Sequence, residues 1–211
     1  MYNNRVVITG IGVSLPEVSG KSDFWNSIMN KTYNFTVTRE KVDNTEKYRY
    51  SGQLESVDLT GVPPIIIKQA DIATQFALST VLMALDDANI KPDDAVVKDI
   101  GFFFGTELGG LKFAEIEYSK YVEKGYRYIS PYLSIGMFYS APIGQLSIIL
   151  GAKGFSKTYC SGECSGSTAI GEAYRVIKDG LAKIIVSGGY EKSNTLSSNL
   201  IYHDKNLLAC G

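Results

Sequence analysis

The sequence predicts an α/β fold, in which a mixed, mainly parallel sheet is covered by helices on both faces. Three apolar runs support this prediction, at residues 5–10, 100–105 and 183–191. Each run is continuous rather than alternating and contains or ends in glycine, which is typical of a strand buried on both sides. Helical patterns separate the runs, and strands that alternate with helices at this spacing form parallel sheets.

The N-terminal part should contain the strand at residues 5–10 and a short helix that covers it. Cap-like polar residues precede apolar residues at helical spacing in residues 22–29. Residues 36–61 are polar, with a possible strand at 48–54, and we expect them at the surface.

The most regular helical pattern spans residues 68–89, where apolar residues recur with a period of 3.6. After it come the strand at 100–105 and a glycine-bearing loop at its carboxyl end, residues 106–110. Residues 113–124 then predict an amphipathic surface helix that contains tyrosines.

Residues 154–171 predict a short strand, a tight Ser-Gly turn and a helix that opens near Glu163 or Cys164. An elbow of this kind presents one side chain together with the unpaired N–H groups of the helix. Negative charge on a reacting acyl group could develop at that point. The stretch therefore has the geometry of an enzyme's active site.

Composition excludes several classes of partner and cofactor. The 211 residues carry a formal net charge of −1 with no basic cluster, which argues against nucleic acid and anionic membranes as partners. The apolar runs are too short to span a membrane, and residues 1–5 lead into a strand rather than a signal sequence, so we expect a cytoplasmic protein. The three cysteines should be reduced thiols. With one histidine, His203, a metal site is not expected, and no cofactor is predicted.

Six short motifs carry a resemblance to a known family. They are residues 6–12, the helix around 75–78, residues 105–111, Ser130-Pro131, Gly144-Gln145 and residues 186–191. In this order and spacing they resemble the N-terminal half of a β-ketoacyl synthase, the condensing enzyme of fatty acid and polyketide synthesis. The resemblance implies a thiolase-like fold, with residues 1–211 as an N-terminal-type domain and the C-terminal half absent.

The nucleophile position departs from the family pattern. In that family a cysteine at the elbow carries the growing acyl chain as a thioester. Counting without a gap from Gly154 and back from Ile170-Gly171 places Glu163 there. A carboxylate is a poor nucleophile toward a thioester and would form a labile anhydride. Cys164 is the alternative nucleophile if the register shifts by one residue; otherwise we expect Cys160 and Cys164 to be buried thiols.

The resemblance also implies that the remaining catalytic groups, two histidines and a lysine, belong to a second half. The chain ends at Gly211 before such a half. His203 lies in a polar stretch that we interpret as a surface loop, and it is not expected to replace them. Condensation by this chain alone is therefore not predicted.

Pairing with another chain is the remaining expectation. In the family, one strand pairs antiparallel with its twin across a dimer axis, and the matching residues here are Phe155, Ser156, Lys157, Thr158, Tyr159 and Cys160. The segment that reaches the partner's acyl pocket corresponds to residues 130–140. It offers Leu133, Met137, Phe138 and Tyr139 as candidate tunnel residues, with ordinary core or interface packing as the alternative.

Three hypotheses follow. The first is a non-catalytic, chain-length-factor-like subunit that forms a heterodimer with a full-length ketosynthase loaded by acyl carrier protein. The second is an enzyme, either a ketosynthase or acyltransferase that uses Cys164 or a malonyl decarboxylase, with groups supplied by another chain. The third is a truncated or purely structural remnant. Glu163 favours the first hypothesis.

Overall fold

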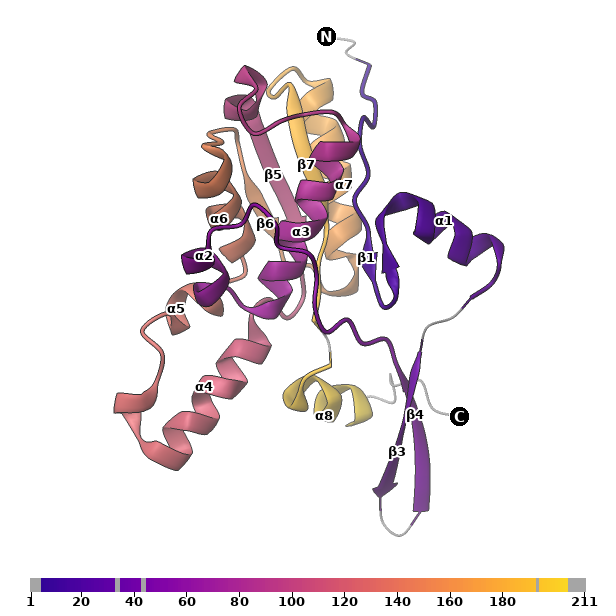
Figure 1. Cartoon of the computed structure of the whole chain (residues 1–211), viewed down its shortest axis with the longest axis vertical. Coiled ribbons are helices and arrows are strands. Elements are labelled where there is room, and N and C mark those ends of the chain that lie inside the picture. Colours follow the sequence, from indigo (N-terminus) through magenta and orange to yellow (C-terminus); the bar gives the residue numbers. More distant parts are fainter. Residues whose placement is uncertain (1–4, 33–34, 43–44, 193, 205–211) are drawn as a thin grey trace.

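The centre of the molecule is a three-stranded parallel sheet with the strand order β6-β5-β7 (Figure 1). The structure is a computed structural model that describes residues 5–32, 35–42, 45–192 and 194–204. The strands of the sheet are β5 (Ile100–Gly105), β6 (Lys157–Tyr159) and β7 (Ile184–Gly189). The parallel pairing of β5 with both neighbours confirms the predicted α/β class.

The other elements are helices and two small hairpins. The helices are α1 (Gly20–Met29), α2 (Pro64–Gln69), α3 (Ile72–Asp87), α4 (Leu111–Lys124), α5 (Leu133–Gly136), α6 (Ala141–Leu150), α7 (Ser165–Lys178) and α8 (Leu196–Asp204). The hairpins are β1 (Ser14–Leu15) with β2 (Val18–Ser19), and β3 (Thr36–Val42) with β4 (Thr45–Ser51). In the described part of the chain, no helix is both long enough and apolar enough to cross a membrane.

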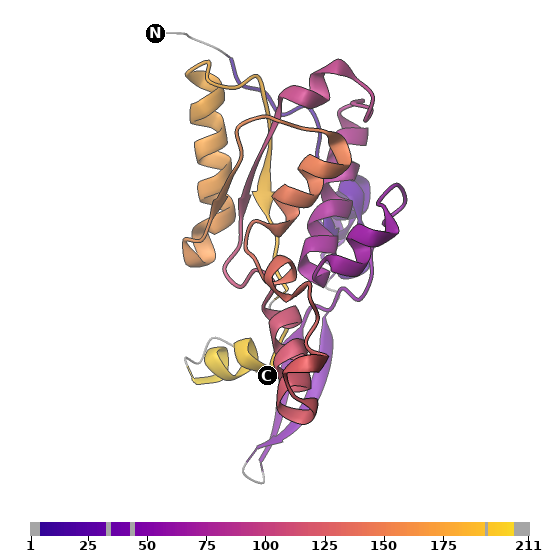
Figure 2. The ribbon, with the colours of Figure 1, turned by 90° about the vertical axis from the view of Figure 1, so that its left-hand side faces the viewer.

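The apolar run of β5 is buried because helices cover both faces of the sheet (Figure 2). Phe102 and Phe104 point into the larger core, which α3 and α6 cover. Phe103 points to the opposite face, where it packs with Ala169 and Ala173 of α7. Successive side chains of a strand point to opposite faces, so a three-phenylalanine run requires a cover on each side.

The N-terminal run at residues 5–10, predicted as a buried strand, is not a strand in the structure. The side chains of Val7 and Ile8 are 57% and 83% exposed. Instead, this segment lies directly against α3, and glycine permits the close approach because it has no side chain. A Cβ on Gly12 would lie 2.0 Å from the carbonyl oxygen of Thr80. An apolar run indicates a preference for burial, but a strand also needs a neighbour with which to pair, and none of the described strands takes that place.

The predicted helices are present with changed boundaries. The helix expected over residues 68–89 is mainly α3, which begins at Ile72 because Asp71 is its N-cap and accepts a backbone N–H of the first turn at 2.7 Å. Lys68 and Gln69 belong to α2 instead. The helices predicted at residues 22–29 and 113–124 are confirmed as α1 and α4. The helix α1 does not bury its apolar side chains against a strand, since Trp25 is 62% exposed.

Two predicted strands of the sheet are shorter or more exposed than expected. The strand predicted at residues 155–160 is reduced to the three residues of β6. The strand predicted at 183–191 is confirmed as β7, but its residues are half-buried rather than buried. The reason is that β7 is an edge strand, with β5 as its one partner among the described residues. The possible strand at 48–54 overlaps β4.

Two helices extend beyond the carboxyl end of the sheet (Figures 1 and 2). The helix α4 follows the loop after β5, and α8 follows β7. The backbone of His203 lies in α8, so the prediction of a loop at this residue is wrong. The carboxylate of Glu115 on α4 accepts hydrogen bonds from the backbone N–H groups of Leu196 at 3.2 Å and Ser197 at 2.6 Å. This contact joins the two helices although they are far apart in sequence.

Candidate functional site

The residues that follow the three parallel strands lie side by side and form the candidate site. Backbone hydrogen bonds fix this edge. The N–H of Thr106 donates to the carbonyl of Tyr159 at 3.1 Å, and the N–H of Tyr190 donates to the carbonyl of Gly105 at 3.1 Å. Cys160 follows β6 directly. Ligands of open α/β sheets bind outside the carboxyl ends of the strands, which makes this edge the candidate site.

The elbow predicted between strand and helix is confirmed here. Gly162 has φ of +64°, a conformation that glycine adopts at little cost. A single 3-10 turn, Gly162–Cys164, then leads into α7. The hydroxyl of Ser165 closes the turn, because it accepts the N–H of Ser161 at 2.8 Å and donates to the carbonyl of Gly162 at 2.5 Å. A Cβ on Gly105 would lie 2.1 Å from the carbonyl carbon of Ser165, so the elbow rests directly on the end of β5.

The elbow exposes the two cysteines and the carboxylate that the sequence singled out, Cys160, Cys164 and Glu163. The prediction that both thiols are buried is therefore wrong. Cys160 lies just beyond the end of β6, and Cys164 is the N-cap residue of α7, before the buried face of that helix begins at Ser165. Partial burial raises the pKa of the Cys160 thiol, and the charge of Glu191 adds to the rise. Glu163 lies in the 3-10 turn, directly before the N-cap residue of α7.

The carboxylate of Glu191 holds the loop that follows β5. It accepts the backbone N–H groups of Glu107 at 2.7 Å and Leu108 at 3.2 Å. The hydroxyl of Thr106 also donates to it, at 3.3 Å. Burial raises the pKa of Glu191, while these hydrogen bonds act in the opposite direction. Since a carboxylate already binds the two N–H groups, this loop does not offer them to an oxyanion.

Two tyrosines complete the edge. The hydroxyl of Tyr190 donates to the carbonyl of Tyr139 at 2.6 Å, and that of Tyr202 on α8 donates to the carboxylate of Glu107 at 3.2 Å. Burial raises the pKa of both phenols, and the nearby charges of Glu191 and Glu107 add to the rise. The pKa of Tyr202 reaches about 12. Both hydroxyls therefore remain protonated donors at neutral pH.

The four candidate tunnel residues lie in α5 and in the connection from α5 to α6. Leu133 begins α5 and is half-buried. Met137, Phe138 and Tyr139 are 45%, 64% and 46% exposed. The backbone of Tyr139 is attached to the sheet edge through Tyr190, so this segment lies at the same end of the sheet as the elbow.

The six residues predicted to pair with a partner chain lie along one edge of the sheet. They are Phe155, Ser156, Lys157, Thr158, Tyr159 and Cys160. On the inner side they attach to β5, since the ring of Phe155 packs edge-on against Phe103 with centroids 5.5 Å apart and the hydroxyl of Ser156 accepts the N–H of Phe102 at 3.0 Å. On the outer side, none of the described strands pairs with β6.

Four residues of the site were not predicted from the sequence, namely Thr106, Tyr190, Glu191 and Tyr202. A usable signal was present for Glu191, because a carboxylate directly after a buried strand and a glycine pair lies at the sheet edge. The tyrosine contacts depend on loops that meet only in the fold. No group of three or more histidine, cysteine, aspartate or glutamate side chains arranged to hold a metal ion occurs among the described residues.

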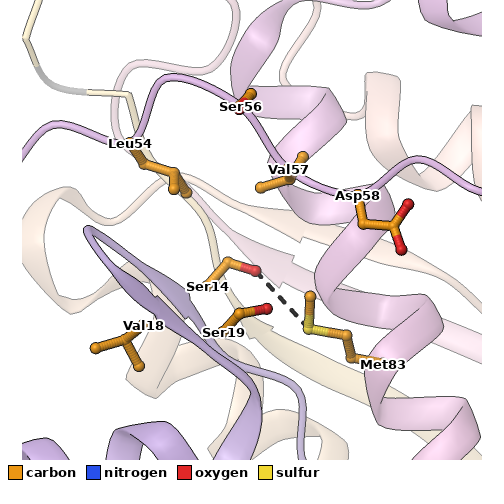
Figure 3. Close-up of a pocket in the computed structure, with 8 residues that line it drawn as sticks. All are labelled: Ser14, Val18, Ser19, Leu54, Ser56, Val57, Asp58 and Met83. Atoms are coloured by element: carbon orange, nitrogen blue, oxygen red, sulfur yellow. Dashed lines mark hydrogen bonds between the residues drawn. The ribbon is translucent and has the colours of Figure 1, made fainter.

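A separate pocket of about 360 Å³ lies between the first hairpin, residues 54–58 and α3 (Figure 3). Within it, the hydroxyl of Ser14 donates to the sulfur of Met83 at 4.0 Å. Asp58 is the charged residue of its lining, and that carboxylate already accepts the N–H and hydroxyl of Thr60 at 2.9 and 2.6 Å. The pocket shares no residue with the elbow, and we assign no function to it.

Comparison with known sequences supports the resemblance of the motifs. The family model described as "Beta-ketoacyl synthase, N-terminal domain" matches residues 3–206. Over 196 residues the chain is 29% identical to 3-oxoacyl-[acyl-carrier-protein] synthase 2 of Synechocystis, which covers 92% of this chain and 47% of the relative. Over 190 residues it is 30% identical to the actinorhodin polyketide putative beta-ketoacyl synthase 2 of Streptomyces coelicolor, covering 89% and 46%. The chain thus spans about half the length of the curated relatives it matches.

Solved structures show the same fold. A type II polyketide synthase acyl-carrier protein in complex with its ketosynthase, bound to the hexaketide, includes a chain that matches with a TM-score of 0.79 at 21% identity. The match covers 95% of this chain and 54% of that one. The ishigamide ketosynthase/chain length factor matches with a TM-score of 0.75 at 16% identity, covering 94% and 50%. The predicted thiolase-like architecture is confirmed for this part of the fold.

Proposed function

The chain belongs to the β-ketoacyl synthase family, and we propose that it is a non-catalytic, chain-length-factor-like subunit in type II polyketide or fatty acid synthesis. In this role residues 1–211 act as an N-terminal-type domain that pairs with a complete ketosynthase and shapes the acyl tunnel. The observation that carries the proposal is the exposed Glu163 in the 3-10 turn that precedes α7. The family resemblance expects a nucleophilic cysteine at that position.

The chemistry of the elbow supports a non-catalytic role. A carboxylate attacks a thioester poorly, and the product would be a labile anhydride. The N–H groups of Glu107 and Leu108 are already bound to Glu191 and are not available to stabilise a reacting oxyanion.

In this role a partner would supply the nucleophile that carries the acyl chain. We propose that the outer edge of β6, with which none of the described strands pairs, joins a complete ketosynthase, because an edge strand readily pairs with another chain. The acyl carrier protein would load that partner. Two structural neighbours, a ketosynthase with its acyl-carrier protein and a ketosynthase/chain length factor, support partners of this kind.

The proposal is tested by reconstitution with a complete ketosynthase from the same genome and malonyl-loaded acyl carrier protein. We expect Phe138→Ala to change the length of the products while condensation continues, because this side chain is 64% exposed on the candidate tunnel segment. Tyr118→Ala is the matched control, since Tyr118 is a 68% exposed aromatic on α4. If the ketosynthase is soluble and makes the same products without this chain, the proposal is wrong and the chain is a remnant.

A catalytic role for Cys164 is the second candidate, and one observation favours it. The thiol is exposed at the N-cap of α7, where helix N–H groups lie close by. A cysteine at such a position can act as an acyl carrier. Replacing Cys164 with serine would then abolish product formation, whereas Cys160→Ser, the matched control, would not. If the chain is non-catalytic, Cys164→Ser and Cys160→Ser should both retain product formation.

A further inference from the structure

We propose that Tyr190 is a positioning residue that fixes the backbone of residues 137–139 and thereby sets the length of the acyl chain that the complex accepts. The inference rests on the proposed function, because it concerns the same candidate tunnel segment. It adds a residue outside that segment, at the end of β7, as a determinant of specificity.

The first support is a single short hydrogen bond. The hydroxyl of Tyr190 donates to the carbonyl of Tyr139 at 2.6 Å, across 51 positions of sequence. Tyr139 lies between the end of α5 and Ser140, the N-cap residue of α6. The bond therefore holds the connection at the point where the chain changes from one helix to the next.

The other end of Tyr190 is fixed in the core of the sheet. Its backbone N–H donates to the carbonyl of Gly105 at 3.1 Å. Its ring packs edge-on against Phe104, with centroids 6.4 Å apart and an interplanar angle of 81°. A side chain whose ring and backbone are both held gives its hydroxyl a defined position.

A second contact locks the same segment from the neighbouring loop. A Cβ on Gly109, whose φ is +54°, would lie 2.4 Å from the ring of Tyr139. A Cβ on Gly110 would lie 2.0 Å from the carbonyl oxygen of Gly136. This loop is held in turn by Glu191, the residue after Tyr190. The end of β7 thus fixes the segment both directly and through the loop.

The consequence is a fixed backbone that carries exposed side chains. Met137 and Phe138 are 45% and 64% exposed, so their own packing does not hold them in place. Discrimination between acyl chains that differ by one two-carbon unit requires side chains at defined positions. Without the Tyr190 hydroxyl, we infer, the segment would move and the product lengths would become less uniform.

The test is Tyr190→Phe, which removes the hydroxyl and retains the ring. It is measured in the reconstituted complex with malonyl-loaded acyl carrier protein, as the ratio of the major product to its neighbours in length. We expect this ratio to fall about two- to tenfold, the range that one net hydrogen bond supports. Tyr174→Phe on α7 is the matched control, because Tyr174 is a 48% exposed tyrosine remote from this connection, and it should leave the ratio unchanged.

Hydrogen exchange gives a readout that does not depend on product formation. The N–H of Ala141 donates to the carbonyl of Phe138 at 3.0 Å within the fixed connection. In Tyr190→Phe, exchange of amides in residues 137–141 should accelerate, and in Tyr174→Phe it should not. If Tyr190→Phe does not fold, Gly109→Ala displaces Tyr139 from the other side, and the same fall in ratio is expected.

The outcomes separate this inference from the proposed function. An unchanged ratio in Tyr190→Phe, with a changed ratio in Phe138→Ala, would overturn the positioning role and leave the proposed function standing. An unchanged ratio in both variants would overturn both. A changed ratio with unchanged exchange in residues 137–141 would also contradict positioning, because the backbone would not have moved.

Discussion

The carboxylate of Glu115 accepts the backbone N–H of Ser197 at 2.6 Å, so a side chain of α4 caps the N-terminus of α8 from 82 positions away in sequence. The same carboxylate accepts the N–H of Leu196 at 3.2 Å. Because the first N–H groups of a helix have no partner within it, this cap stabilises α8 at the edge that carries the candidate site.

Replacement of Glu115 with alanine should loosen α8. Loss of a helix cap costs about 1–2 kcal/mol, and we expect faster hydrogen exchange in residues 196–204 by the corresponding factor. Glu123→Ala on the same helix is the control, because Glu123 is exposed near the other end of α4. Equal exchange of α8 in the two variants would show that the cap does not hold the helix.

Glu117 should contribute a pH-dependent part of the stability. Burial raises its pKa, but Lys120 at 2.6 Å and the N–H of Ser130 at 2.6 Å outweigh burial, and the pKa falls below its usual 4.5. A depressed carboxyl pKa stabilises the fold above the unfolded-state value, and the stability is lost as the pH falls through the folded-state value. The difference in unfolding free energy between the natural chain and Glu117→Gln should therefore have its full value above about pH 5. It should shrink as the pH falls below 4.5. A difference that grows on acidification would contradict this assignment.

A methyl group on Gly12 should displace the N-terminal segment. Its Cβ would lie 2.0 Å from the carbonyl oxygen of Thr80, and we expect Gly12→Ala to lower the unfolding free energy by about 1–3 kcal/mol. Gly171→Ala is the matched control on α7, where nothing lies within 4 Å of the added Cβ. That substitution should raise stability by up to about 1 kcal/mol, because alanine favours helices over glycine. Chemical denaturation of both variants measures the contrast.

Cys160 should react slowly with alkylating reagents although it is exposed. Partial burial and the charge of Glu191 raise the pKa of its thiol above the usual 9.0, which lowers the thiolate fraction at neutral pH. Glu191→Gln removes the charge and should accelerate alkylation of Cys160 by iodoacetamide at pH 7.5, measured by peptide mapping. No acceleration would show that the two groups are not coupled.

The sequence predicted the parts of the fold that have a local pattern. The phenylalanines of β5 were predicted as a buried strand because a continuous apolar run needs cover on both faces. The six motifs identified the family, which the family comparison confirms. The elbow was located from its Ser-Gly turn, and Gly162 has the positive φ that such a turn needs.

What the sequence could not predict depends on contacts between distant segments. Val7 and Ile8 have the composition of a strand, but no neighbour pairs with them among the described residues. The exposure of Cys160 follows from a strand that ends one residue earlier than expected. The contacts of Glu191 and Tyr190 join residues 51 to 85 positions apart, and a periodic sequence pattern does not predict such pairs.

A non-catalytic role requires an elbow that does not carry acyl chains, and acyl transfer tests this directly. The complex with a complete ketosynthase is incubated with acyl-loaded acyl carrier protein, and both chains are mapped by peptide mass. We predict an acyl group on the partner's active-site cysteine and none on this chain, with Glu163 and Cys164 both unmodified. An acyl adduct on Cys164 that disappears in Cys164→Ser and persists in Cys160→Ser would contradict the account.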